Sequence, residues 1–139
     1  MASESKSLVY SAKLLIAPSK ASISSVLADP IITSCKSAIQ SRGIFALVLS
    51  GGSLPSFLGT LSQLFEKAGV DAQWDKWHVL LADERCVPST DPDSNLRSIR
   101  SNFTNAVPIP QNQVYGIDEG LLSSIESTDA VAMAYEEKF

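Results

Sequence analysis

The sequence predicts an α/β fold with an open parallel sheet and flanking helices, in a single domain that spans residues 1–139. Segments with strand-like and helix-like patterns alternate along the chain, as expected of parallel strands joined by helices. Two of these segments are uninterrupted apolar runs, which are typical of strands inside such a sheet. The length of 139 residues also suits one domain better than two. Because ligands of such sheets bind at the carboxyl ends of the strands, we expect functional residues there.

The first part of the chain combines a short strand with a long helical pattern. Residues 8–10 (LVY) suit a short edge strand. Between residues 19 and 42, apolar residues recur at spacings of three and four, which predicts a helix. We expect Pro30 to break or restart this helix, because proline removes a backbone donor and its ring clashes with the preceding turn. Gly43 is a natural C-terminal stop.

Two apolar runs are the strongest strand candidates. Residues 44–49 (IFALVL) show no polar alternation, which predicts a strand covered on both faces. Residues 77–82 (WHVLLA) form a second apolar strand. Residues 54–68, between the two runs, place their apolar side chains on one helical face and predict a helix, with Ser53 as its N-cap.

The last part of the chain is expected to be less regular. The loop CVPSTDPD is rich in turn formers, and Ser94 is expected to cap a short helix that runs to about Phe103. The two aspartates of that loop suit the positive end of this helix. A short strand is expected at residues 114–115 and a final helix at residues 127–137.

Composition excludes several classes of protein. The net charge is −4, with 11 basic and 15 acidic residues, which argues against a nucleic-acid binder. No apolar run approaches the roughly 20 residues of a membrane span, and the N-terminus lacks the apolar core of a signal peptide. Cys35 and Cys86 lie far apart, outside any metal-binding spacing, so we expect no disulfide, no structural zinc and a cytoplasmic location.

Small residues end the first apolar strand, in the run Ser50-Gly51-Gly52-Ser53 with Pro55 close behind. Glycine accepts positive φ and lets a ligand approach the backbone, and proline is tolerated in the first turn of a helix. The free N–H groups of that turn and the helix dipole would favour an anion, above all a phosphate. The alternative is a tight turn that needs only small residues. Neither a P-loop nor a GxGxxG pattern is present, so no dinucleotide site is predicted.

Three charged residues, Asp83, Glu84 and Arg85, follow the second apolar strand. Arg85 could clamp a phosphate or carboxylate through two hydrogen bonds. Asp83 could position a water or a sugar hydroxyl, or simply hold Arg85. The alternative is a solvated loop with an internal ion pair. If the two strands are neighbours, this cluster and Ser50–Ser53 share one crevice.

The remaining candidates have simpler interpretations. His78, the only histidine, lies inside the second strand, so we interpret it as structural. Trp74 and Trp77 are expected to pack rather than to stack on a ligand. Arg97 and Arg100 lie three residues apart, so both can line one side of the short helix.

At these clusters the sequence resembles the 6-phosphogluconolactonase family, within the glucosamine/galactosamine-6-phosphate isomerase superfamily. The resemblance covers the chain from about Ile44, is looser before it, and is specific because SGGS-x-P and DER-x-VP occur together. It implies a Rossmann-like α/β fold. It also implies a hydrolase without metal or cofactor, which opens 6-phospho-D-glucono-1,5-lactone to 6-phosphogluconate in the oxidative pentose phosphate pathway. The matching pieces are LSGGSLP (49–55), ADERCVP (82–88), DSNLRSIR (93–100) and VPIPQNQVYGID (107–118).

The resemblance also implies the site. Asp83 would support catalysis, and the sugar-phosphate lactone would lie among a set of binding residues. These substrate-binding residues are Gly51, Gly52, Ser53, Arg85, Asn95 and Arg100.

One departure from the family pattern is important. Family members carry a later Gly-x-Gly-x-Asp-Gly-His segment whose histidine is the general base, and this sequence has no such segment. The sequence therefore resembles an N-terminal portion, truncated before the last strands, and we expect it to be an incomplete catalyst that can self-associate along the open sheet edge. Two alternatives are a non-catalytic sugar-phosphate-binding module and a glucosamine-6-phosphate deaminase-like isomerase. In the latter, tyrosine usually stands at the position of Arg85.

Overall fold

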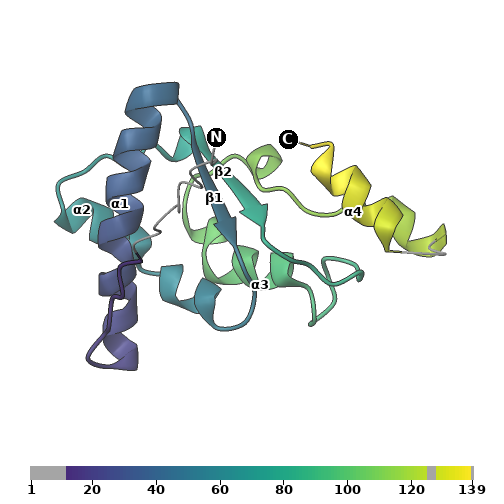
Figure 1. The fold of residues 1–139 in the computed structure, drawn as a ribbon, viewed down its shortest axis with the longest axis horizontal. Coiled ribbons are helices and arrows are strands. Elements are labelled where there is room, and N and C mark those ends of the chain that lie inside the picture. The colour runs from purple at the N-terminus through teal and green to yellow at the C-terminus, as the bar shows by residue number, and fades with distance from the viewer. Residues whose placement is uncertain (1–11, 125–127, 139) are drawn as a thin grey trace, which may run out of the picture.

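The structure, a computed structural model, describes residues 12–124 and 128–138 and contains two parallel strands flanked by helices (Figure 1). The α-helices α1 and α2 lie on the β1 side of the strand pair, and α4 lies on the β2 side. The expected edge strand at residues 8–10 lies outside the described residues. The strands and α-helices are α1 (Ile23–Arg42), β1 (Phe45–Leu49), α2 (Leu61–Lys67), β2 (Trp77–Leu81), α3 (Asn95–Asn102) and α4 (Asp129–Glu136). The 3-10 helices are η1 (Lys20–Ser22), η2 (Leu54–Leu58), η3 (Trp74–Lys76), η4 (Thr104–Ala106), η5 (Gln111–Gln113) and η6 (Glu119–Ser124).

The two predicted strands are direct neighbours. β1 and β2 pair in parallel, with a register that runs from Phe45 opposite Trp77 to Leu49 opposite Leu81. On the other side of β2, Val79 forms a single parallel bridge with Val114, which is all that the described residues show of the strand expected at 114–115. The order of parallel strands and intervening helices confirms the predicted α/β architecture.

Only one face of this sheet is covered by the described residues. Phe45 and Leu49 of β1 are buried, whereas Ala46 is exposed and Val48 is 57% exposed. The expectation that β1 is covered on both faces is therefore wrong for this part of the chain. A run of apolar residues does not reveal which side of a strand has a neighbour, and here the packed helices cover alternate residues only.

Aromatic side chains form the centre of the core. Trp77 has no exposed surface, and its ring centroid lies 4.6 Å from those of both Phe45 and Trp74. The indole Nε1–H of Trp77 donates a 2.7 Å hydrogen bond to the Ala72 carbonyl, which satisfies its one polar group. The packing role expected for the two tryptophans is confirmed.

The long first helix is continuous through its proline. Helix α1 includes Pro30 and ends at Gly43, whose φ of 79° is the left-handed conformation of a C-terminal glycine. The expected break at Pro30 is wrong. Pro30 is exposed, while Ala28 and Ile32 on either side are buried. The lost hydrogen bond thus falls on the solvent side, and packing of the inner face holds the helix together.

The helix predicted over residues 54–68 is divided in two. The 3-10 helix η2 ends at Leu58, and α2 begins only at Leu61. Ser53 occupies the N-cap position of η2, as expected, but it has helical backbone angles and its side chain makes no capping hydrogen bond. The periodicity of apolar residues placed Leu58, Leu61 and Phe65 correctly in the core, because a short interruption keeps them on the same side.

No helix among residues 12–124 and 128–138 is both long enough and apolar enough to cross a bilayer. Both cysteines, Cys35 and Cys86, are free in the structure. Cys35 lies in the core with 1% of its surface exposed, and Cys86 is exposed. Burial raises the pKa of the Cys35 thiol to about 11, because a thiolate there would lose its hydration.

The two thiols should therefore react at very different rates. With a maleimide at pH 7.5, we expect Cys86 to react about a hundredfold faster than Cys35, because only an accessible thiolate is a good nucleophile. Mass spectrometry of timed samples measures both rates, and a urea-unfolded sample, in which both should react quickly, is the control. Two equal rates in the folded chain would contradict the burial of Cys35.

Candidate functional site

Two loops that bear polar residues leave the sheet at the same edge. Leu49 and Leu81 end the paired strands in register, and Ala82 N donates a 2.8 Å hydrogen bond to Leu49 O just beyond the pair. The run Ser50–Ser53 and the run Asp83–Arg85 therefore start side by side. The condition set by the sequence, that the strands be neighbours, is met.

Asn95, the first residue of α3, lies between the two loops. Its side chain is 5% exposed, and its Nδ2 donates a 3.0 Å hydrogen bond to the Asp83 carbonyl. On the other side it fills the space beside Gly51, where a Cβ atom would overlap the Asn95 amide. Any residue with a side chain at position 51 would clash with the Asn95 amide, so this position requires glycine. The amide of Asn95 links the loop after β1 to the loop after β2.

The carboxylate of Glu84 binds the N-terminus of α3. Oε1 accepts hydrogen bonds from the backbone N–H groups of Arg85 (2.8 Å) and Asn95 (2.7 Å). Oε2 accepts from the backbone N–H of Leu96 (2.9 Å) and from the hydroxyl of Ser94 (3.1 Å). Four donors and the positive end of the helix dipole thus surround one negative charge.

The start of α3 was only partly predicted. Ser94 caps the helix as expected, accepting a 3.2 Å hydrogen bond from Arg97 N. Asp91, which was expected to complement the helix dipole, instead accepts a 2.8 Å hydrogen bond from Asp93 N within the loop. Glu84 binds the N-terminus of α3 instead, a role that was not predicted from the sequence. The sequence offered one hint: Glu84 is an acidic residue at a strand end, and roles had been predicted for Asp83 and Arg85 on either side but not for Glu84.

The glycine-rich loop itself presents backbone donors. Gly52 has a φ of 69° and open space where a side chain would begin. Gly52 and Ser53 are exposed, and no group in the described residues accepts a hydrogen bond from their N–H groups. Because η2 is a short 3-10 helix, the expected contribution of a long helix dipole is small here. Anion binding at this loop would depend on the N–H groups themselves.

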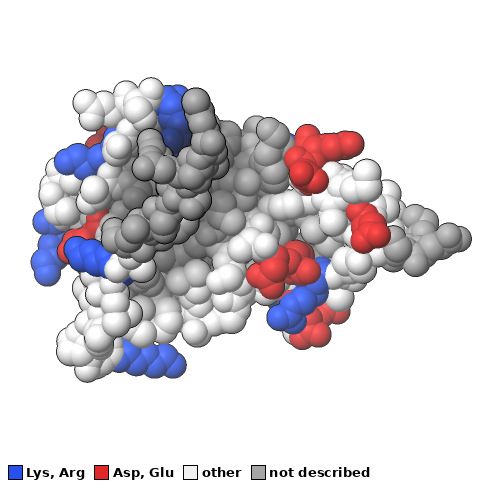
Figure 2. All heavy atoms as spheres, viewed as in Figure 1, with Lys and Arg blue, Asp and Glu red and all other residues white. Residues whose placement is uncertain are grey.

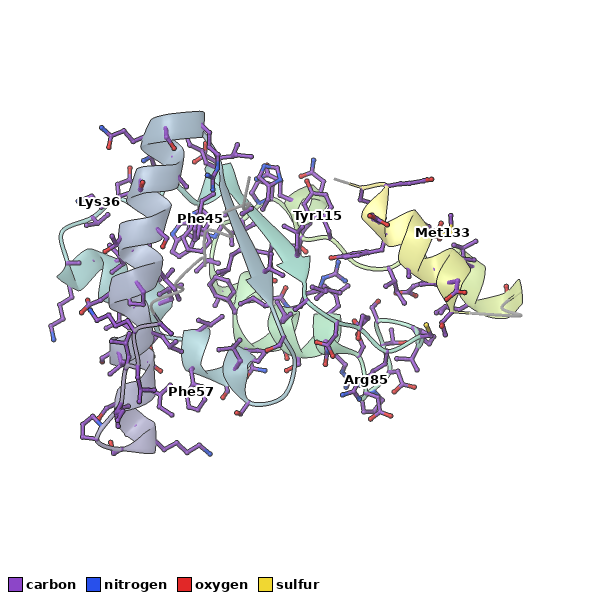
Figure 3. All side chains as sticks on the ribbon, viewed as in Figure 1. Lys36, Phe45, Phe57, Arg85, Tyr115 and Met133 are labelled. Atoms are coloured by element: carbon purple, nitrogen blue, oxygen red, sulfur yellow. The ribbon has the colours of Figure 1, made fainter. Side chains whose placement is uncertain are left out.

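Asp83 and Arg85 are both exposed, and Figure 3 shows the position of Arg85 near the edge of the molecule. Within the described residues, neither side chain forms a hydrogen bond or an ion pair, so the ion pair considered from the sequence is not present there. Arg97 is also exposed and donates from Nη1 to the Thr90 carbonyl at 2.8 Å. Of the three, Asp83 and Arg85 are the side chains left available to a ligand.

Arg100 lies in the last turn of α3. It follows Asn95 by more than one helical turn, is partly buried, and its Nε has no hydrogen-bond partner among the described residues. Its charge acts on Glu119, whose pKa lies below its ordinary value mainly because Ser89 donates hydrogen bonds to it, and also because Arg100 is nearby. The substrate-binding role of Arg100 stays a prediction.

His78 lies in the middle of β2. Its Nδ1 is 2.8 Å from the Tyr115 hydroxyl, and the two rings stack with 5.8 Å between centroids. These contacts fit the structural role that the sequence predicted. No group of three or more histidine, cysteine or acidic side chains in the described ranges is arranged to hold a metal ion.

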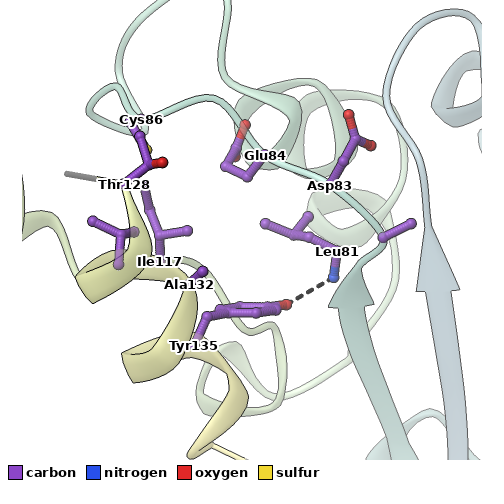
Figure 4. A pocket seen from close by; sticks show the side chains of 10 residues that line it. Leu81, Asp83, Glu84, Cys86, Ile117, Thr128, Ala132 and Tyr135 are labelled. Atoms are coloured by element: carbon purple, nitrogen blue, oxygen red, sulfur yellow. Dashed lines mark hydrogen bonds between the residues drawn. The ribbon is translucent and has the colours of Figure 1, made fainter.

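A cavity of about 270 Å³ lies beside the Asp83–Arg85 loop, between the end of β2 and α4 (Figure 4). The Tyr135 hydroxyl accepts a 2.8 Å hydrogen bond from Leu81 N at its base and donates a 3.2 Å bond to the Tyr115 carbonyl. Burial raises the pKa of Tyr135. The cavity includes Asp83 and Glu84 but none of the glycine-rich loop, so it is distinct from the junction at Asn95.

Charge is unevenly distributed over the surface. On the face shown in Figure 2, most Lys and Arg side chains lie over the end with α1 and α2, and most Asp and Glu lie toward α4. An anionic ligand at the strand ends would thus depend on local donors rather than on a broad positive field.

Comparison with known proteins identifies relatives over most of the chain. The family described as glucosamine-6-phosphate isomerases/6-phosphogluconolactonase matches residues 18–139. "Probable 6-phosphogluconolactonase 5" of Arabidopsis thaliana is 34% identical over 126 residues, which are 90% of this chain and 48% of that protein. "6-phosphogluconolactonase 3, chloroplastic" from the same plant is 41% identical over 98 residues, or 70% of this chain and 28% of the relative. The chain spans about half the length of the first of these relatives.

Solved structures agree on the fold. The 6-phosphogluconolactonase of Thermotoga maritima superposes with a TM-score of 0.66 at 24% identity, over 84% of this chain and 49% of that one. The Trypanosoma cruzi enzyme of the same name gives 0.66 at 22% identity, over 89% and 47%. At this level of identity the similarity establishes the Rossmann-like α/β fold.

The contact between Gly51 and Asn95 can be tested by a double-mutant cycle. We expect Gly51→Ala to lower the free energy of unfolding by about 2 kcal/mol, because the added methyl overlaps the Asn95 amide. In an Asn95→Ala background that amide is gone, and the cost of Gly51→Ala should fall below about 1 kcal/mol. Urea unfolding measures both values.

Gly52→Ala is the matched control. It adds the same methyl group in open space at positive φ, so we expect the same cost, about 1 kcal/mol, in both backgrounds. An equal cost of Gly51→Ala with and without the Asn95 amide would show that the two residues do not compete for space.

Proposed function

Because the chain belongs to the glucosamine-6-phosphate isomerase/6-phosphogluconolactonase family, we propose that it supplies the sugar-phosphate-binding part of a 6-phosphogluconolactonase. The substrate would be 6-phospho-D-glucono-1,5-lactone and the product 6-phosphogluconate. The names of the relatives support this assignment, and the comparisons extend over about half the length of the first of them.

One observation carries the proposal. Asn95 links the loop after β1 to the loop after β2, so the free N–H groups of Gly52 and Ser53 and the side chain of Arg85 leave the same edge of the sheet. Backbone N–H groups and a guanidinium are the donors that a phosphate prefers. The proposed phosphate contacts are therefore Gly52, Ser53 and Arg85, and Gly51 acts by making space for Asn95.

Hydrolysis of the lactone adds water to its C1 carbonyl and breaks the bond from C1 to the ring oxygen. We assign Asp83 a supporting role at this end of the substrate, because its carboxylate is exposed and its carbonyl is held by Asn95. His78 is bonded to Tyr115 in mid-strand, so it has no role in this scheme. Activation of water is assigned to the histidine of the Gly-x-Gly-x-Asp-Gly-His segment that the family resemblance implies. This chain by itself should then bind substrate far better than it hydrolyses it.

Arg85 favours the lactonase over the deaminase-like alternative, since tyrosine is usual at that position in deaminases. Arg100 is proposed as a residue at the border of the site, where its charge also helps to lower the pKa of Glu119. We also propose a cytoplasmic location, with the plastid as the alternative that some relatives' names suggest. Among residues 12–124 and 128–138, β1 pairs only with β2, and Val48 is exposed. These two features support the proposal that the chain can self-associate, which sedimentation at several concentrations would test.

Binding of 6-phosphogluconate tests the proposed function. Calorimetry or an NMR titration should show saturable binding that gluconate, which lacks the phosphate, does not reproduce. We expect Arg85→Ala to weaken binding at least about tenfold, since a charge-assisted bidentate contact is lost. Gly52→Val should also weaken binding, because valine is strained at positive φ.

Arg42→Ala is the matched control, because it removes the same charge from an exposed residue at the end of α1. The affinity of the Arg42→Ala variant for 6-phosphogluconate should stay within about twofold of that of the unmodified chain. If a folded sample shows no binding, or if Arg85→Ala binds as well as the unmodified chain, the proposed phosphate site is wrong.

A further inference from the structure

We propose that Glu84 is a positioning residue for substrate binding, which fixes Arg85 toward the phosphate and keeps the phosphate away from the N-terminus of α3. This inference rests on the proposed function. Glu84 lies between Asp83 and Arg85, two proposed site residues, and in this proposal it does not itself contact the substrate.

The carboxylate of Glu84 ties its own loop to a helix. One oxygen accepts from Arg85 N within the loop and from Asn95 N on α3, and the other accepts from Leu96 N and Ser94 Oγ. The backbone of Arg85 is thus held at a set distance from α3. With the hydrogen bond from Asn95 Nδ2 to the Asp83 carbonyl, the loop is held on both sides of Glu84.

This arrangement leaves the guanidinium of Arg85 free. Adjacent glutamate and arginine side chains could pair with each other, but the Glu84 carboxylate is directed into the helix terminus and Arg85 is exposed. Among residues 12–124 and 128–138, no ion pair involves Arg85. Because the Glu84 carboxylate accepts hydrogen bonds from the N-terminus of α3, it does not pair with Arg85. The positive charge of Arg85 therefore stays available for the phosphate.

The same contacts exclude a competing anion site. The first N–H groups of an α-helix attract anions, and α3 begins at the same sheet edge as the glycine-rich loop. The N–H groups of Asn95 and Leu96 are already bonded to Glu84, whose charge also repels a second anion. The phosphate would then bind only to Gly52, Ser53 and Arg85. Its position at these residues would set the orientation of the sugar.

The direction in which one substitution changes the affinity for 6-phosphogluconate distinguishes a positioning role from mere proximity. Glu84→Gln keeps the shape and removes the charge. A carboxylate that merely lay near the phosphate would weaken binding by repulsion, so its removal would strengthen binding. If Glu84 positions Arg85, the substitution weakens binding instead, because an amide nitrogen replaces one carboxylate oxygen and cannot accept the two hydrogen bonds that this oxygen accepts.

A double-mutant cycle measured by NMR titration of the ¹⁵N-labelled full chain with 6-phosphogluconate tests the proposal. We expect Glu84→Gln to weaken binding about tenfold in the unmodified chain and by less than about twofold in the Arg85→Ala background. Glu66→Gln, the same change on an exposed residue of α2, is the control and should have no effect. If Glu84→Gln does not fold, Glu84→Asp takes its place in the cycle, because it keeps the charge but is too short to reach both pairs of donors.

Three outcomes would overturn the inference. Unchanged or tighter binding by Glu84→Gln would make Glu84 a neighbouring charge only. Equal weakening with and without the Arg85 side chain would indicate a general loss of structure rather than an effect through Arg85. Absence of 6-phosphogluconate binding by the unmodified chain would overturn the proposed function and this inference together, whereas the first two outcomes leave the proposed function intact.

Discussion

The in-register parallel pairing of β1 with β2 is the constraint on which the rest of the structure depends. It places Leu49 opposite Leu81, so two loops that are about 30 residues apart in the sequence leave the sheet together. The pairing also aligns Phe45 with Trp77 on the covered face, where the aromatic core forms. A shift of one residue would turn Trp77 to the open face and separate the loops from the core that supports them.

Helix α3 fixes the positions of the two loops that leave this edge of the sheet. Its first residue, Asn95, fills the space that Gly51 leaves and holds the Asp83 carbonyl. Its unpaired N–H groups are satisfied by Glu84, so the positive end of the helix is used for internal structure. The available donors at this edge are therefore those of the glycine-rich loop and of Arg85. In the proposed site, Gly51, the amide of Asn95 and the carboxylate of Glu84 would together limit where an anion can bind.

Local patterns predicted most of the elements, because they depend on short-range periodicity and on caps. The apolar spacing of α1, the capping serine of α3 and the two apolar strands all had a signal within a few residues. Other predictions failed, and for Pro30 and for the face of β1 that the described residues leave exposed, contacts with other elements decide the outcome. Pro30 is tolerated because packing of Ala28 and Ile32 outweighs one lost hydrogen bond, and the helix after Ser53 is interrupted without disturbing its buried face. The open face of β1 depends on which segments pack against it, which its own apolar run cannot reveal.

The sequence by itself determined the α/β order and the family, and it located the two polar runs at strand ends, because motifs and strand boundaries are local properties of the chain. It could not determine which members of those runs face a ligand. Only the tertiary structure showed that Asn95 bonds to the Asp83 carbonyl, that Glu84 binds the N-terminus of α3, and that the charge of Arg100 acts on Glu119. The physical reason is that a hydrogen-bonding group becomes available only when no nearer partner takes it, and those partners come from elements distant in the sequence.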